Sequence, residues 1–221
     1  MPPLPKTSQE TILKVASELA AAEGLRGVGV RAIAAKLQIS PGTLYNVIGD
    51  IDDIILHVNE RTLIGLRDAL RNAAAPERNP TTNVLAAAKA YVDFVRAHPR
   101  RWSMLIEYSL ATDKELPAWY HKTLDETIGT VDQLLRPLIA GRRDRQRAVT
   151  VLWAALEGIA SLTASGKLSL VNDEDPHVLV KLLISRFLGT YQSEEITEDR
   201  REPVDRPRRK PADPNTRRNR A

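Results

Sequence analysis

Hydrophobic residues recur along this chain at the three- and four-residue spacing of an α-helix, from about residue 7 to residue 192. The strict alternation of apolar and polar positions that is typical of a half-buried strand is missing. We therefore predict an all-α protein. Its first helix is expected to begin at a capping box formed by Thr7 and Glu10, to bury one apolar stripe, and to end at Gly24.

Two short helices are predicted directly after the first one. The earlier of the two covers about residues 31–37 and presents Ile33 and Leu37 on one face. The later one starts after Ser40, a good N-cap, with Pro41 at the first helical position, where a missing N–H costs nothing. A turn of about three residues joins the two helices, which is the spacing of a helix-turn-helix motif.

Longer helices are predicted for the rest of the chain. A fourth helix is expected after the cap residue Asp50, and the segment AAAPERNPTT interrupts the pattern behind it. Further helical segments are predicted at about residues 81–97, 99–111, 117–140, 143–165 and 174–191. We predict three regions, namely a helix-turn-helix head over residues 1–50, a larger helical body over residues 51–192 and a disordered charged tail over residues 193–221.

The tail prediction rests on composition. Residues 193–221 contain nine Arg or Lys and seven Asp or Glu, hence a surplus of two positive charges, and no aromatic residue. Such a segment buries too little apolar surface to offset the entropy cost of ordering. Its RPRRK and TRRNR clusters suit either a solubilising tail or contacts to nucleic-acid phosphates.

Composition also limits the class of protein. The 221 residues are 43% hydrophobic and 27% charged, which suits a globular protein with a real core, and they include no cysteine. The N-terminus lacks the apolar core of a signal peptide. The longest apolar-rich run, residues 149–162, is too short to span a bilayer and is interrupted by Glu157. We expect a soluble cytoplasmic protein with no membrane partner.

Patterns typical of enzymes and metal sites are weak. The four histidines show no ligand pair at helical spacing, and we interpret His57 with Glu60 as a surface ion pair. Gly166 and Lys167 lack the other residues of a phosphate-binding loop, and no G-x-S-x-G segment occurs. We therefore predict that the protein is not an enzyme and has no metal site and no cofactor.

The segment ILKVASELAAAEGLRGVGVRAIAAKLQISPGTLY resembles the N-terminal domain of TetR-family transcriptional regulators. The resemblance covers about residues 9–55, and the family motif S-x-G-T-L-Y is matched by Ser40, Gly42, Thr43, Leu44 and Tyr45. It implies that the third helix lies in the major groove of double-stranded DNA. Early residues of that helix would meet base edges, while hydroxyl and backbone N–H groups would hold phosphates.

Carried over residue by residue, the resemblance implies a set of DNA contacts. Asn46 would make the bidentate contact to adenine that its amide permits, and Pro41 would pack on a thymine methyl or a sugar. Leu44 is expected in the small core instead. The implied DNA-binding residues are Arg31, Lys36, Ser40, Pro41, Gly42, Thr43, Tyr45 and Asn46.

The sequence departs from the family pattern after the third helix. Where the family usually has an aromatic residue or His, then Phe, then Lys, this chain has Val47, Ile48 and Ile51, and Gly29 replaces the Thr that caps the second helix. Losing a Lys and a donor in each subunit removes up to about four phosphate contacts in a dimer, so DNA affinity and its salt dependence should both fall. The acids at positions 50, 52 and 53 would repel phosphate, although acids in a first turn also suit the helix dipole.

The body resembles the regulatory domain of the same family. Trp153 and Gly158 match a Trp-x-x-x-His-Gly signature of one subgroup, with Glu157 in place of the His. Glu157 is suited to a cationic ligand, to a rim position or to a salt bridge between subunits. The resemblance implies a ligand cavity near Phe94, Trp102, Ile106, Tyr108, Trp119, Tyr120 and Glu157, although plain core packing also explains the aromatic residues.

Two apolar stripes are candidates for a subunit interface. The first contains small residues and comprises Val151, Ala155, Gly158 and Leu162, and the second comprises Val180, Ile184, Phe187 and Tyr191. In the family the corresponding helices pair with their copies as a four-helix bundle, so the resemblance implies a homodimer. Packing within one chain is the alternative.

These features together predict a homodimeric, ligand-responsive transcriptional regulator. We expect a repressor that binds an inverted-repeat operator and is released by a small apolar effector. The alternative is a helical module that binds a small molecule or a protein and carries a vestigial DNA-binding head. An enzyme that uses the body cavity is a third alternative.

Overall fold

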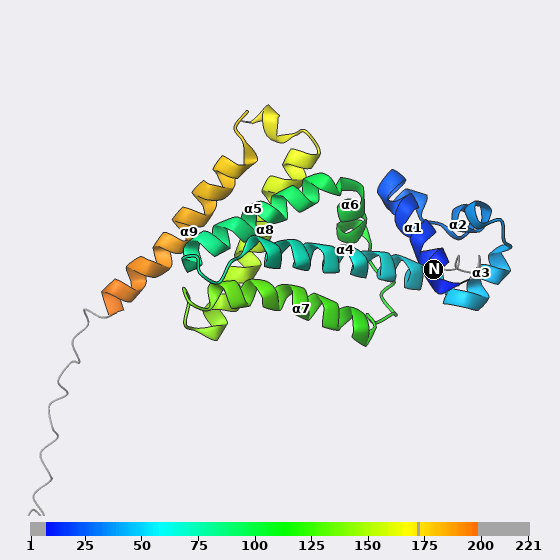
Figure 1. The fold of residues 1–221 in the computed structure, drawn as a ribbon, viewed down its shortest axis with the longest axis horizontal. Helices are drawn as coiled ribbons and strands as arrows, with labels where there is room; N and C mark the ends of the chain where they lie inside the picture. Colours follow the sequence, from blue (N-terminus) through cyan, green and yellow to red (C-terminus); the bar gives the residue numbers. More distant parts are fainter. Residues whose placement is uncertain (1–7, 172, 199–221) are drawn as a thin grey trace, which may run out of the picture.

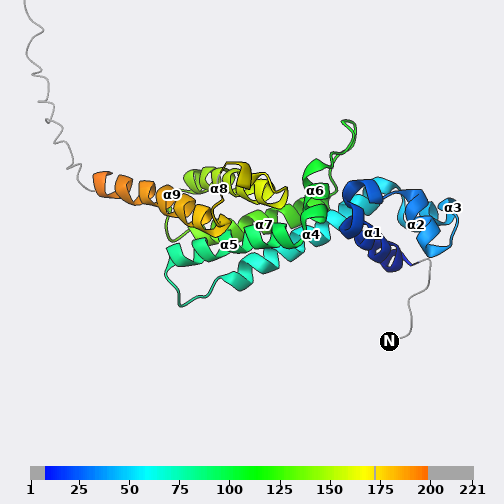
Figure 2. The same cartoon turned by 90° about the horizontal axis from the view of Figure 1, so that it is seen from above.

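The computed structural model describes residues 8–171 and 173–198, and within these residues it contains helices and no strand. The all-α prediction is therefore confirmed. The head comprises α1 (Gln9–Glu23), η1 (Gly24–Gly27), α2 (Val30–Leu37) and α3 (Pro41–Ile48). The body comprises α4 (Ile51–Ala73), α5 (Pro80–Ala97), α6 (Pro99–Glu107), α7 (Ala118–Leu135), α8 (Arg142–Ala164), η2 (Leu168–Leu170) and α9 (Pro176–Glu198). The head lies at one end of an elongated molecule and α9 at the other (Figures 1 and 2).

The first helix begins one residue later than the sequence suggested. Its N-cap is Ser8, whose side chain accepts a hydrogen bond from the backbone N–H of Thr11 at 3.2 Å. The predicted capping box of Thr7 and Glu10 is therefore wrong, and Thr7 itself lies outside the described residues. The predicted end is confirmed, since Gly24 closes α1 with a φ of 66°, a conformation that favours glycine.

The head core is small and completely apolar at its centre. Ile12, Ile33 and Leu44 are fully buried, and each comes from a different helix of the head. The same cluster includes Ile54 from the start of α4 and Met104 from α6. The head is thus packed onto the first turns of α4 and onto α6, so the helix that follows residue 50 contributes to both parts of the molecule.

The start of α4 is held by a reciprocal capping box. The Asp50 carboxylate accepts from the backbone N–H of Asp53 at 3.0 Å, and the Asp53 carboxylate accepts from the backbone N–H of Asp50 at 3.2 Å. The turn before it requires Gly49 with a φ of 83°. Two of the three acids in this segment therefore satisfy backbone donors that a helix start leaves unpaired.

In the body, α5 lies against α4, α8 and α9, while α7 runs beside α4 (Figure 1). The α7 helix ends at Leu135, five residues earlier than predicted, because Pro137 cannot donate a backbone hydrogen bond within a helix. The buried Arg145 stabilises the turn that follows. It binds Asp132 at 3.0 Å and the carbonyl oxygens of Ile139 and Ala140 at 3.0 and 2.7 Å.

The last two long helices lie on one side of the body. The α9 helix runs to Glu198, past residue 193 where the predicted tail begins, and residues 199–221 lie outside the described residues. Of the described helices, α8 alone is long and apolar enough to cross a membrane by length and composition. It packs against α5, α7 and α9 through buried residues that include Leu152 and Leu156, while Val151 and Leu162 on its other face remain exposed.

Candidate functional site

The α3 helix presents one face to solvent and one face to the head core. Pro41, Gly42, Tyr45 and Asn46 are exposed, whereas Leu44 is fully buried beneath them. Tyr45 is 49% exposed, which is high for a large aromatic residue. The solvent-exposed face of α3 therefore carries an amide, a phenol and a proline ring.

The N-terminus of α3 is fixed by local hydrogen bonds. The Ser40 side chain accepts from the backbone N–H of Thr43 at 3.1 Å, and the two hydroxyl groups lie 2.9 Å apart. Arg31 and Lys36 are both exposed on the neighbouring helix α2. All eight predicted DNA-binding residues thus belong to α2, to α3 or to the N-cap of α3, and these two helices form the end of the head that lies away from the body (Figure 1).

A lysine that sequence reasoning missed binds the acids next to this surface. Lys114, in the loop between α6 and α7, donates to Asp50 at 2.7 Å and to Asp52 at 2.5 Å. The Tyr108 hydroxyl donates to the other oxygen of Asp52 at 2.7 Å. We call these four residues the acid clasp. It connects the start of α4 to a loop of the body and cancels part of the negative charge that faces the DNA-binding end.

The acid clasp shifts the pKa values of its members. The hydrogen bond from Lys114 lowers the pKa of both Asp50 and Asp52 below the usual value, and the hydrogen bond from Tyr108 lowers the pKa of Asp52 further. The two carboxylates raise the pKa of Lys114. Burial, followed by the bond to Asp52, raises the pKa of Tyr108. All three charges are therefore retained at neutral pH.

The body contains a large cavity of about 950 Å³ between the helices α4 to α9. This volume lies within the range of cavities that bind small molecules. Most of its lining is aliphatic or aromatic, with Leu66, Leu70 and Leu134 on its walls. Of the predicted ligand residues, Trp102 and Ile106 line it.

Glu157 lies beside this cavity and is bound by two of its aromatic residues. One carboxylate oxygen accepts from the Tyr91 hydroxyl at 2.6 Å and from the Trp102 ring N–H at 2.8 Å. Burial, followed by this hydrogen bond, raises the pKa of Tyr91, which keeps its phenol protonated. Glu157 therefore has donors within its own chain, and the rim position and the intersubunit salt bridge are not needed to explain it.

The remaining predicted ligand residues lie away from the large cavity. Tyr108 belongs to the acid clasp, and Phe94 lines a smaller pocket nearer the head. Trp119 stacks on His57 with ring centroids 4.2 Å apart. Tyr120 is buried beside it, and burial raises its pKa to about 12. The sequence identified these aromatic residues as candidates, but it did not predict which helix each one would contact.

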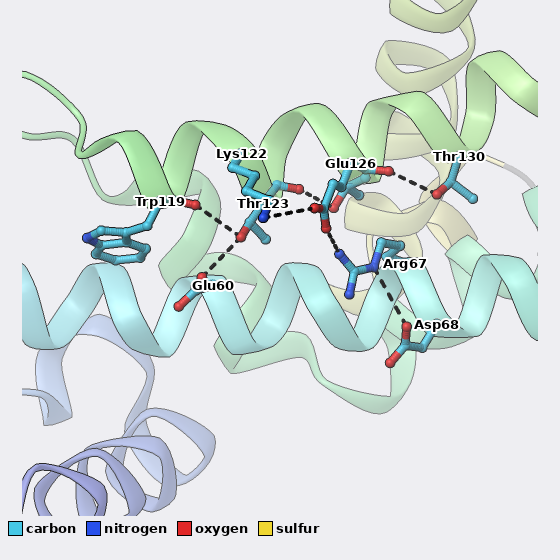
Figure 3. A network of polar contacts seen from close by, with 9 residues as sticks. Glu60, Arg67, Asp68, Trp119, Lys122, Thr123, Glu126 and Thr130 are labelled. Atoms are coloured by element: carbon cyan, nitrogen blue, oxygen red, sulfur yellow. Dashed lines mark hydrogen bonds and ion pairs between the residues drawn. The ribbon is translucent and has the colours of Figure 1, made fainter.

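A row of polar contacts joins α4 to α7 (Figure 3). The Thr123 hydroxyl donates to Glu60 at 3.0 Å, and the largely buried Arg67 pairs with Glu126. Glu60 also lies 3.4 Å from His57, so the predicted surface pair is half-buried in this contact. The α7 helix forms a wall of the cavity and α4 enters the head, so these contacts connect the two.

The predicted subunit interface is only partly exposed. On α8, Val151, Gly158 and Leu162 are exposed, and Ala155 is half-buried. On α9, Val180 and Ile184 are 0% and 1% exposed because they pack against the body core, so their assignment to an interface is wrong.

Two other stripe members on α9, Phe187 and Tyr191, are half-buried against the same core. The opposite face of α9 instead exposes Val178 and Leu182, by 48% and 53%. These two residues, with Ser185 and Gly189, follow a spacing of four, three and four residues that fits one helix face. The sequence therefore contained this second stripe, and only the packing shows which of the two is free.

Comparison with known proteins agrees with this geometry. The profile of the family described as "Bacterial regulatory proteins, tetR family" matches residues 12–58, and that of "Tetracyclin repressor-like, C-terminal domain" matches residues 84–187. The chain is 34% identical over 92 residues to YobS of Bacillus subtilis, described as an uncharacterized HTH-type transcriptional regulator. That match covers 42% of this chain and about half, 48%, of the relative.

Two solved structures show how widely the fold is shared. A protein of unknown function from Rhodococcus sp. RHA1 has a TM-score of 0.70 at 19% identity, covering 86% of this chain and 96% of the other. The regulator FadR of Bacillus subtilis in complex with stearoyl-CoA has a TM-score of 0.62 at 12% identity, covering 81% and 97%. The two family profiles match the head and the body in the same order as the helices described above. The chain is therefore a helix-turn-helix protein. The chain belongs to the TetR family.

Proposed function

We propose that this protein is a homodimeric transcriptional repressor that recognises an inverted-repeat DNA site through α3 and is released by an apolar effector. The observation that carries the proposal is the free face of α3. Asn46 and Tyr45 are exposed there on a helix whose buried Leu44 fixes its orientation. Phosphate contacts from Arg31 and Lys36 would position the helix, and Asn46 would supply sequence specificity.

The proposed dimer uses the free faces of α8 and α9. Val151, Gly158 and Leu162 on α8 would meet the copy of Val178 and Leu182 on α9, which would bury side chains that one chain leaves exposed. The small residues Ala155 and Gly158 let two helices approach closely. Such a dimer presents two α3 helices to the DNA. To bind both halves of an inverted repeat, these helices must lie about 34–36 Å apart, one turn of DNA, or a multiple of that distance.

The proposed effector is a largely apolar molecule bound in the cavity of about 950 Å³. Arg136 and Arg142 line the cavity where α7 ends and α8 begins, whereas Trp102 lines it on α6. The binding of stearoyl-CoA by FadR, a protein of the same fold, supports an effector with an apolar chain and a charged end.

Release from DNA would follow from linkage between the two sites. An effector that favours a body conformation with the two heads wrongly spaced must lower DNA affinity by the same factor by which DNA lowers effector affinity. The contacts of Glu60 and Arg67 with α7 offer the physical connection, because α4 continues into the head core. We therefore propose α4 as the element that transmits the change.

Selection of bound fragments from genomic DNA tests this function. The full chain is expected to enrich fragments that share an inverted repeat, and Asn46→Ala is expected to lose that enrichment while it still retains DNA at low salt. No enrichment by the wild-type chain would instead favour the alternative, a ligand-binding helical module with a vestigial head. The acids at the start of α4 motivate that alternative, but two of them are bound to Lys114.

A further inference from the structure

A second cavity, of about 300 Å³, lies where the head meets the body. Its lining comes from α1, α4, α5 and α6, and includes Ser17, Arg61, Thr62, Phe94, His98 and Arg101. It shares no lining residue with the larger effector cavity. We call it the junction pocket.

The junction pocket is lined by basic residues without a counter-charge. Two guanidinium groups, of Arg61 and Arg101, and the imidazole of His98 line it, and no Asp or Glu does. Neither arginine forms an ion pair within the described residues. Arg61 is exposed and Arg101 is half-buried, whereas the buried Arg145 has Asp132 as its partner.

The Arg101 guanidinium, which lines this pocket, is only partly hydrogen-bonded. The Nε atom of Arg101 has no hydrogen-bond partner in the described part of the chain, although another nitrogen of the same guanidinium donates to the Ser17 carbonyl at 3.3 Å. A buried N–H without an acceptor is destabilising, so native proteins rarely leave one unpaired. An oxyanion bound in the pocket would instead pair with Nη1 of Arg101, which has no hydrogen bond within the described residues.

The other residues of the pocket limit the chemical class of ligand that fits it. The hydroxyl protons of Ser17 and Thr62 already go to the carbonyl oxygens of Leu13 and Val58, at 2.7 and 3.1 Å. The donors left for a ligand are therefore the basic groups. Phe94 adds an aromatic surface, edge-on to the His98 ring at a centroid distance of 4.8 Å.

We propose that the junction pocket binds a small organic oxyanion, a phosphate or carboxylate group held by Arg61 and Arg101 with its carbon part against Phe94. Guanidinium groups bind both kinds of oxyanion through paired N–H donors, and such charge-assisted bonds are about twice as strong as neutral ones. Because α1 belongs to the head and α4 to α6 to the body, the bound anion lies at the boundary between the two parts. This site is independent of the proposed DNA recognition and of the effector cavity.

The test is a calorimetric titration of the full chain with inorganic phosphate and, in a second arm, with succinate, at constant ionic strength. Saturable binding is expected with at least one of the two anions, and the stronger arm identifies phosphate or carboxylate as the preferred group. Arg61→Gln is expected to weaken that binding at least about tenfold, because it removes a charged hydrogen-bond donor. Arg71→Gln, an exposed arginine further along α4, is the matched control and is expected to bind as the wild type does.

Arg101→Gln provides a second variant, which also removes the bond to Ser17, so its folding is checked by its unfolding midpoint. Equal responses in the wild type, Arg61→Gln and Arg71→Gln would overturn the site, since general screening by salt treats all three alike. Absence of saturable binding of both anions would overturn it as well. Neither result depends on DNA, so failure here is distinct from failure of the proposed repressor function.

Discussion

At the scale of single residues, Asn46 and Leu44 lie on opposite sides of α3. The exposed Asn46 is available to bind DNA, whereas the buried Leu44 stabilises the head core. Asn46 is exposed, and its amide can donate to and accept from one adenine. We predict that Asn46→Ala costs about 1–3 kcal/mol of binding free energy on the preferred DNA site and much less on random DNA. Titration of both duplexes by fluorescence anisotropy measures the two losses.

Asn72→Ala is the control for that substitution. Asn72 is an exposed amide near the end of α4 that lies away from the head, so its loss should leave both affinities unchanged. Equal losses of Asn46→Ala on both duplexes would show that Asn46 contacts the backbone and not a base.

Lys114 neutralises part of the acidic charge beside the proposed DNA-binding surface. We predict that Lys114→Met weakens binding to specific and random duplexes alike, by about three- to tenfold at low salt, because Asp50 and Asp52 then lie uncompensated near phosphate. Binding measured at low and high salt checks this, with the exposed Lys167→Met as control. A loss confined to the specific duplex would contradict the electrostatic explanation.

The acid clasp also predicts a pH dependence of stability. Asp50 and Asp52 have lowered pKa values, so their stabilising contribution is complete above the unfolded value of 3.8 and is lost as the pH falls through the lower folded values. The difference in thermal midpoint between wild type and Lys114→Met should therefore stay constant from pH 7 to pH 5. It should shrink only below pH 3.8. A difference that disappears between pH 6 and pH 5 would show that another group is responsible.

Single residues also show what the sequence does not determine. Ser40 and Asp50 were predicted as caps, and Pro41 as a first helical residue, because helix starts depend on neighbours within a few positions, and the structure confirms all three. The acid clasp depends on Lys114, which is more than sixty positions from Asp50 along the chain. No local pattern predicts that pair, because its geometry arises only after α6 and α4 pack together.

At the scale of elements, α8 gives the clearest prediction about how two copies of the chain form a dimer. Gly158 is exposed and a Cβ built on it meets no atom within 4 Å, so a side chain there is tolerated by the single chain. We predict that Gly158→Arg places a charge in the proposed helix bundle and yields a monomer. Gly158→Ala, the control, should remain a dimer and gain about 0.5–1 kcal/mol from helix propensity. Light scattering measures the mass, and a soluble Gly158→Arg dimer would point to another interface.

The α9 helix explains why the interface could be predicted only in part. Its two apolar stripes, one with Val180 and Ile184 and one with Val178 and Leu182, both have helical spacing. Which of them is buried depends on where α5 and α8 lie, and sequence periodicity does not contain that information. The early end of α7 has a local cause, Pro137, and was therefore predictable in principle.

At the scale of the whole molecule, α4 is the element common to both parts. Its first turns complete the head core through Ile54, its middle contacts α7 through Arg67, and its apolar face with Leu66 lines the large body cavity. The all-α fold and the family were predictable because periodicity and a short motif carry them. The cavity was not, since its shape comes from the way six helices, α4 to α9, pack together.

The central claim is that α3 recognises a DNA sequence and that the chain binds it less tightly than a family member with a cation at position 51. Ile51 lies at the first position of α4, beside the DNA-binding end. The most direct measurement titrates wild type and Ile51→Lys against the selected duplex and a scrambled one at two salt concentrations. The wild type is predicted to prefer the selected duplex, and Ile51→Lys is predicted to bind both duplexes more tightly, most at low salt. Equal binding of the two duplexes by the wild type, with no preference created by Ile51→Lys, would contradict the claim.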